Sequence, residues 1–153
     1  MLIRALLLLL HLLAAAVWVG GMAAMNFAVR PAAAQVLSGT ERLRFMAAVL
    51  SHFMAWVATA IVVLLVSGLG MIVEAGGLGA MHWSVHAMAL IGLVMVAIFG
   101  HLRFAAWRRL DRQIQLGQPQ AAAATLAVIR HLVVLNLALG AVVFGVAVIG
   151  RVI

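Results

Sequence analysis

Residues 45–75 read FMAAVLSHFMAWVATAIVVLLVSGLGMIVEA, and this stretch decides the fold class. Its first aspartate, glutamate, lysine or arginine is Glu74, one residue before its end. A helix needs about 20 predominantly apolar residues to cross the hydrocarbon core of a membrane. The stretch therefore predicts a transmembrane helix that ends at the glycine-rich turn of Gly76, Gly77 and Gly79.

Three further apolar runs meet the same criterion, at about residues 5–29, 81–102 and 121–150. The first is expected to end at Arg30-Pro31, because proline cannot continue a helix, and the third at Arg103. Short connections between consecutive spans make neighbouring helices antiparallel. The sequence therefore predicts an all-α, integral membrane four-helix up-down bundle, in which residues 1–153 form a single transmembrane domain.

Composition supports a lipid environment. Hydrophobic residues make up 68% of the chain and charged residues only 8%, a balance that a water-exposed surface does not tolerate. The net charge is +7, and all ten basic residues are arginines at or near the ends of apolar runs. Arginines in these places orient helices and meet anionic headgroups, so the predicted partner is the lipid bilayer and not nucleic acid. Cysteine is absent, which excludes disulfides and thiolate metal sites.

The connections between the spans predict the orientation. Seven arginines lie in or beside the first and third connections: Arg30, Arg42, Arg44, Arg103, Arg108, Arg109 and Arg112. The second connection, residues 74–80, has no basic residue. Connections rich in arginine remain on the cytoplasmic side. We therefore expect a multi-pass protein of a bacterial-type inner (plasma) membrane, with both termini on the outer side.

The six histidines are distributed over all four spans: His11, His52, His82, His86, His101 and His131. A polar ring inside a membrane span needs a partner or a ligand. With a rise of 1.5 Å per residue, His11 and His86 lie roughly 26–28 Å above the cytoplasmic arginines. His52 lies roughly 12 Å above them, and His131 falls in the same inner third of the membrane. The histidines thus define an outer and an inner level.

Diagonal histidines at equal height suit a planar macrocycle that is ligated from both sides. In an up-down bundle the first and third helices are diagonal partners, and so are the second and fourth. His11 with His86, and His52 with His131, would then each ligate one haem iron. The sequence predicts a transmembrane b-type diheme cytochrome that carries electrons across or within the membrane. Its partner would be quinone or another redox protein, and an activity as a membrane haem oxidoreductase is left open.

Three other residues have supporting roles in this interpretation. Arg130 lies beside His131 at the inner edge, where a haem propionate needs a charge-assisted partner. Gly70 lies five turns beyond His52 and leaves room for a macrocycle, although close helix packing favours the same residue type. Trp83 flanks the outer level, or serves as an interfacial anchor.

The same residue types also suit copper. His82 and His86 are four residues apart and share a helix face, and Met81 adds a soft thioether ligand. His101 is a further alternative ligand. The alternative hypothesis is therefore a copper transport or resistance membrane protein that binds copper through histidine and methionine. A third hypothesis is a small subunit that packs against a larger membrane complex, and assembly as a homo-oligomer is left open.

The segment HLLAAAVWVGGMAAMNFAVRP, from His11 to Pro31, resembles the opening helix of the copper-resistance D (CopD) family. The matching features are a histidine, a tryptophan followed by glycines, and a helix-ending proline: His11, Trp18, Gly20, Gly21 and Pro31. Members of that family are usually assigned to copper uptake or resistance. HemJ-type protoporphyrinogen oxidases open similarly and bind b-type haem in a four-helix bundle. The resemblance therefore implies a metal-handling membrane bundle, with copper or haem as its ligand.

Overall fold

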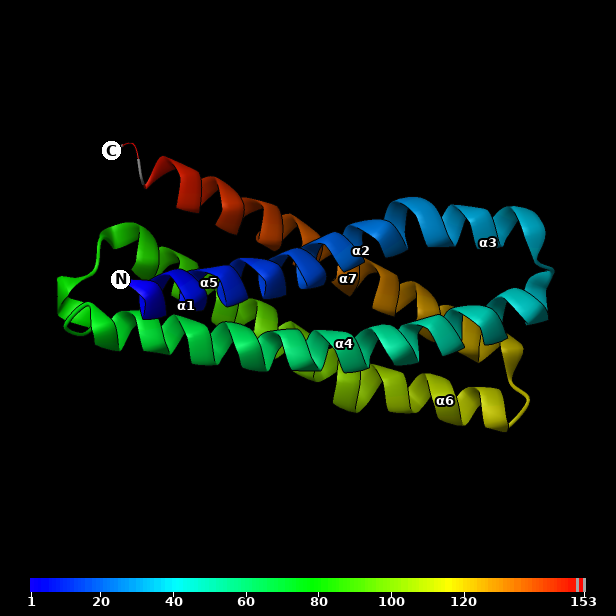
Figure 1. The fold of residues 1–153 in the computed structure, drawn as a ribbon. Helices are drawn as coiled ribbons and strands as arrows, with labels where there is room; N and C mark the ends of the chain where they lie inside the picture. The colour runs from blue at the N-terminus through cyan, green and yellow to red at the C-terminus, as the bar shows by residue number, and fades with distance from the viewer. Residues whose placement is uncertain (151, 153) are drawn as a thin grey trace.

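The computed structural model describes residues 1–150 and 152, and in them four long helices run up and down beside one another (Figure 1). The four helices are 31 to 36 residues long, and each is apolar enough to cross a membrane. Helices of that length measure roughly 47–54 Å. Each therefore exceeds the ~30 Å hydrocarbon core. The predicted all-α membrane bundle is confirmed.

Two of the four long helices are built from several segments. The first contains α1 (Leu2–Ala15), α2 (Gly21–Ala24) and α3 (Arg30–Val36), joined by the π-helical turns η1 (Ala16–Gly20) and η2 (Met25–Val29). The second is the uninterrupted α4 (Gly39–Glu74), which the 3-10 turn η3 (Leu78–Ala80) follows. The third contains α5 (Trp83–His101), the π-helical turn η4 (Leu102–Ala106) and α6 (Trp107–Gln115). The fourth is α7 (Pro119–Ile149).

The helices pack mainly as two antiparallel pairs. The first helix lies along α4, and α5 with α6 lies along α7. Both termini and the α4–α5 connection are at one end of the bundle, which we call the terminal end (Figure 1). The α3–α4 and α6–α7 connections are at the other end, which we call the arginine end because Arg30, Arg42 and Arg112 lie there (Figure 1).

The expected end of the first helix at Arg30-Pro31 is wrong. The helix continues through Pro31 to Val36. Pro31 falls at the start of α3, directly after the π-helical turn Met25–Val29. A π-helical turn inserts an extra residue and shifts the register of the backbone hydrogen bonds. Proline has no backbone N–H to donate, and at this position the regular i to i−4 hydrogen bonds are already interrupted.

The second helix begins earlier than the apolar run predicts, because the sequence carries a start signal there. Ser38 and Glu41 form a capping box at the first turn of α4, in which the Glu41 carboxylate accepts from the Ser38 N–H and hydroxyl. This arrangement satisfies free N–H groups at the helix start. At the other end of α4 the predicted glycine turn is confirmed, since Gly76 and Gly77 have φ of 94° and 101°, values that favour glycine.

The third helix also runs past its expected end at Arg103, through Gln115. The extension α6 is amphipathic: Leu110 is completely buried, whereas Arg108 and Arg109 are exposed. A basic amphipathic segment next to a membrane span has its charged face in the headgroup region. The arginines therefore mark the interface and do not stop the helix.

Buried side chains form two clusters along the bundle axis. The cluster nearer the arginine end includes Leu50, Leu102, Leu110, Ala122 and Ile129. The cluster nearer the terminal end includes Trp18, Met22, Val57, Ile61 and Met95. Large apolar side chains also cover the outside, among them Trp56, Val62, Leu69, Phe104 and Val148. An apolar exterior over an equally apolar interior is expected for a bundle that lies in lipid.

Candidate functional site

His11 is the histidine that the fold brings partly inside. Its Nδ1 lies 3.0 Å from Oγ of Ser67 on α4, a residue that is 2% exposed. The Ser67 hydroxyl donates to the Val63 carbonyl at 2.6 Å, so the His11 Nδ1–H is the donor to Ser67. The proton on Nδ1 leaves the lone pair on Nε2 of His11 free to bind a metal.

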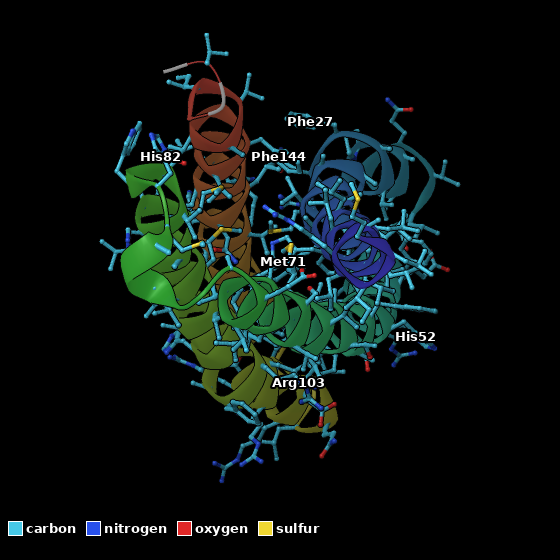
Figure 2. All side chains as sticks on the ribbon, turned by 60° about the vertical axis from the view of Figure 1, so that its left-hand side comes forward. Phe27, His52, Met71, His82, Arg103 and Phe144 are labelled. Carbon is cyan, nitrogen blue, oxygen red and sulfur yellow. The ribbon has the colours of Figure 1, made fainter. Side chains whose placement is uncertain are left out.

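His52 and His131 both lie on exposed faces of their helices. Nδ1 of His52 donates to the Ala48 carbonyl at 3.0 Å, and Nδ1 of His131 donates to the Ala127 carbonyl at 2.9 Å. Each ring is therefore held by its own helix, and Figure 2 shows His52 on the outside of the bundle. The fold does not bring these two rings together in the interior, and their joint ligation of a haem stays a prediction.

The other histidines are exposed as well. His82, His86 and His101 have exposed side chains on or directly before α5. His82 is the N-cap residue of α5, with its Nδ1 3.0 Å from Oγ of Ser84, and it lies on a different side of the bundle from His52 (Figure 2). Its ring contacts exposed Trp83, with 5.6 Å between the ring centroids. His11 and His86 thus differ in surroundings, one half-buried and one exposed.

The room expected beside Gly70 is filled by a side chain. A Cβ added at Gly70 would meet Cδ1 of Leu7 at 3.1 Å, so α1 packs directly against this position. Gly68, one half-turn earlier, is equally close to the His11 ring, with 3.3 Å to Cε1. Both glycines let α1 approach α4 closely, which is the helix-packing role that small residues have in membranes.

The interior of the bundle is rich in thioethers. Five of the nine methionines are at most 8% exposed: Met22, Met25, Met46, Met54 and Met95. They come from the first three long helices and are shared between the two buried clusters. Met71, Met81 and Met88 are half-buried, and Met71 and Met81 lie near the terminal end.

One buried polar side chain lies among these apolar residues. Asn136 on α7 is 1% exposed, and its Nδ2 donates to the Met95 carbonyl at 3.3 Å. Its Oδ1 accepts no hydrogen bond from any residue that the structure describes. Buried polar atoms are almost always paired, so an orphaned carbonyl oxygen indicates a water or an ion. The sequence carries a signal for it, because Asn136 is a lone polar residue between Leu135 and Leu137 in an apolar run, but the sequence interpretation did not single it out.

The donor set of the interior is therefore soft. Within residues 1–150 and 152, no group of three or more histidine, aspartate or glutamate side chains is positioned to hold a metal ion. The core offers thioethers and the Asn136 amide oxygen, while the hydroxyls of its other buried polar residues already have hydrogen-bond partners: Ser67, Ser84 and Thr125. Thioether sulfur selects copper(I) among biological metals, because both are soft and polarisable.

A groove of about 910 Å³ opens at the arginine end, between α3, the first turns of α4 and the first half of α7. Three arginines line it: half-buried Arg30 and exposed Arg42 and Arg130. A smaller cavity of about 30 Å³ is lined by Met25 and Met46 and shares Arg30 and Arg130 with the groove. Arg130, expected beside an inner haem, is thus a groove residue, and the neighbouring His131 is exposed.

The chain matches a known protein family. Residues 47–149, two thirds of the chain, match the family described as Copper resistance protein D. The match starts inside α4 and ends at the last residue of α7, so it contains Met54, Met95 and Asn136 but not His11. No curated protein and no solved structure matches the chain.

Proposed function

The chain belongs to the Copper resistance protein D family, and on that basis we propose that it binds copper(I) inside its membrane bundle and admits it from the terminal end. The proposal makes the alternative hypothesis from the sequence the main one. Copper here is the cargo of the protein, and a soft monovalent ion is the form that can enter an apolar interior at the lowest cost of desolvation.

The buried thioethers carry the proposal. Met22 and Met95 belong to one buried cluster, and they are 2% and 3% exposed. Methionine also packs irregular gaps in ordinary cores. Here, however, the thioethers come from several helices, and the backbone of one of them, Met95, is hydrogen-bonded to Asn136, whose Oδ1 has no partner among the described residues.

Asn136 supplies that polar group. Because its Nδ2 is held by the Met95 carbonyl, its Oδ1 has a fixed position next to the segment that bears the Met95 thioether. An amide oxygen is a lone-pair donor without charge. Copper(I) bound by thioethers with Oδ1 as an additional neighbour would satisfy this oxygen, which otherwise costs folding free energy.

The placement of ligating side chains favours entry from the terminal end, which carries exposed Arg4 as well. That end carries the Glu74 carboxylate at the end of α4, the imidazole of His82 and the half-buried Met71. Each of these can attract or bind a copper ion at the surface. The opposite end presents three arginines in its groove, which repel a cation. A cation would therefore be collected at one end and opposed at the other.

The direct test is an anaerobic titration of the purified full chain in detergent with copper(I), in competition with a chromophoric copper(I) chelator. We expect the protein to withdraw copper(I) stoichiometrically and to leave zinc(II) unbound, because thioethers select soft ions. Failure to compete with a chelator of micromolar affinity would contradict the proposal.

Haem b is a second candidate, and the geometry of His11 favours it. The hydrogen bond to Ser67 orients the ring and leaves Nε2 free, as in metal-bound histidines that are held by a second partner. Electron transfer would be the chemistry that the haem supplies. The other expected ligands are exposed, so a haem on His11 would need a further ligand from a neighbouring molecule or a rearranged helix.

The visible spectrum distinguishes the two candidates. Haem b gives a Soret band that shifts on reduction, whereas copper(I) bound to thioethers is colourless. A purified protein that carries stoichiometric haem, lost on His11→Ala, would make the haem function the main one.

A further inference from the structure

The groove at the arginine end has no role in copper binding, and its own chemistry points to a different ligand. We propose that it binds an anionic phospholipid, with the phosphates on Arg30, Arg42 and Arg130 and an acyl chain along α7. The inference is independent of the proposed copper function. It rests on the charge, the free backbone donors and the apolar lining of one groove.

The groove collects positive charge that the protein does not neutralise. The three arginines come from three different helices and face one opening. Only three acidic side chains exist in the chain, Glu41, Glu74 and Asp111. Glu41 accepts from Ser38 in the capping box, and Asp111 accepts from Gln115. Since Glu74 is at the terminal end, the guanidinium groups are left for an anion from outside the chain.

Free backbone donors add to this charge. α7, a helix of 31 residues, begins at Pro119 on the groove wall, and Gln118 provides no side-chain cap. The first helical N–H that finds an acceptor is that of Ala122, which donates to the Gln118 carbonyl at 3.0 Å. The N–H groups of Gln120 and Ala121 precede it and have no helical acceptor. Helix N-termini of this kind favour phosphate groups.

The rest of the lining is apolar and matches a lipid chain. Leu43 and Met46 on α4 and Leu126, Ala127 and Val134 on α7 form the wall away from the helix ends. From Pro119 to Val134 the groove follows α7 for roughly 22 Å. At about 910 Å³ it is far larger than a phosphate ion needs. Basic pockets between membrane helices bind headgroups with more than one phosphate, and three guanidinium groups suit two phosphates better than one.

The test measures lipid binding by the delipidated full-chain protein in neutral detergent. Three probes are compared: cardiolipin, phosphatidylcholine and inorganic phosphate. We expect cardiolipin to bind at least about tenfold more tightly than phosphatidylcholine, because only its charge matches the groove. Inorganic phosphate should bind much more weakly than cardiolipin, because it has no acyl chain to contact the apolar wall of the groove.

Variants assign the binding to this groove. The double variant Arg30→Gln, Arg130→Gln should lose cardiolipin affinity on the order of 30-fold. The double variant Arg108→Gln, Arg109→Gln removes the same charge from the exposed face of α6 and should stay within about threefold of the parent. Exposed Arg42→Gln provides a third variant that does not disturb packing, with an expected loss of about fivefold.

Three results would overturn the proposal. An equal loss in the α6 double variant would show attraction to the net charge alone. Binding of inorganic phosphate as tightly as cardiolipin would show an anion site without a lipid. If the purified parent protein contained haem and the groove variants did not, the arginines would be shown to hold haem propionates.

Discussion

Nδ2 of Asn136 donates a hydrogen bond to the backbone carbonyl of Met95 across 3.3 Å and so ties α7 to α5 inside the bundle. The same side chain leaves Oδ1 without a donor among the described residues. An unsatisfied buried polar atom lowers the free energy of unfolding by about 1–3 kcal/mol. A ligand that contacts Oδ1 would remove this penalty, which links the stability of the bundle to what it binds.

Asn136→Leu separates stability from binding. Leucine has a similar volume and removes the unsatisfied oxygen, so we expect the free energy of unfolding to stay unchanged or to rise by about 1 kcal/mol. Copper(I) affinity should fall. Thermal unfolding and chelator competition measure the two effects. Thr125→Val on the same helix is the control: its hydroxyl donates to Oε1 of Gln113 at 2.7 Å, so its loss should reduce stability without changing copper affinity.

Exchange of thioethers for hydrocarbon tests the ligands themselves. Met22→Leu and Met95→Leu conserve volume, and each should reduce the free energy of unfolding by less than about 1.5 kcal/mol. Each should weaken copper(I) binding by at least about tenfold. Met88→Leu, at a half-buried position on α5 outside both clusters, should leave the affinity unchanged. An equal copper(I) affinity in all three variants would show that these methionines only fill space.

Ser67→Ala tests whether His11 is a ligand. The substitution removes the acceptor that orients the ring, and any haem held by His11 should then bind about 10–100-fold more weakly. A haem titration followed at the Soret band gives the affinity. Thr59→Val on the same helix, where the hydroxyl donates to the Ala55 carbonyl, should have no such effect. Unchanged haem affinity in Ser67→Ala would remove His11 from the list of ligands.

Gly140→Ala tests the close approach of the first helix to α7. A Cβ at this position would lie 2.8 Å from Cγ2 of Val19, so we expect a loss of about 1–3 kcal/mol in the free energy of unfolding. Gly100→Ala meets no atom within 4 Å and should instead stabilise its helix by up to about 1 kcal/mol. Thermal unfolding of the two variants in detergent checks the difference. Equal stabilities would mean that the two helices can separate at Val19 without cost.

The orientation can be measured with single cysteines, since the chain contains none of its own. Gln35→Cys and Gln118→Cys report on the arginine end and Leu78→Cys on the terminal end; all three positions are exposed. A membrane-impermeant maleimide added to spheroplasts should label Leu78→Cys alone, because arginine-rich connections remain in the cytoplasm. Labelling of Gln35→Cys and Gln118→Cys instead would reverse the orientation and with it the side from which we propose that copper enters.

The helices could be predicted from the sequence because an uninterrupted run of about 20 apolar residues usually forms a membrane-spanning helix. Their ends could not. Pro31 is a usual stop signal, yet the π-helical turn directly before it allows the helix to continue. Arg103, which lies within the π-helical turn Leu102–Ala106, marks the edge of the apolar run and does not end the helix. The Ser38–Glu41 capping box, by contrast, was readable as a start signal and lies outside the apolar run that defined the second span.

The heights of the histidines could be estimated from residue counts, but the directions in which they point could not. In a soluble helix the polar face identifies the outside. In lipid both sides are apolar, so hydropathy does not distinguish exposed Trp56 from its neighbour Val57, which is 1% exposed. The paired-histidine interpretation assumed that His52 faces inward. Phe53 and Met54, directly after it, take the inward positions in this fold.

The π-helical turns give the first helix a property that an α-helix of the same length would lack. Each one adds a residue to a turn, so every side chain beyond it is rotated by roughly 100° relative to the side chains before it. The turn Met25–Val29 thus sets the angular phase of Arg30 and of all of α3 independently of the histidine-bearing half. Deletion of one residue there would keep the helix and its hydropathy and turn the arginine away from its groove. The half of this helix that bears His11 and the half that bears Arg30 can in this way be adjusted separately, by insertions and deletions instead of substitutions.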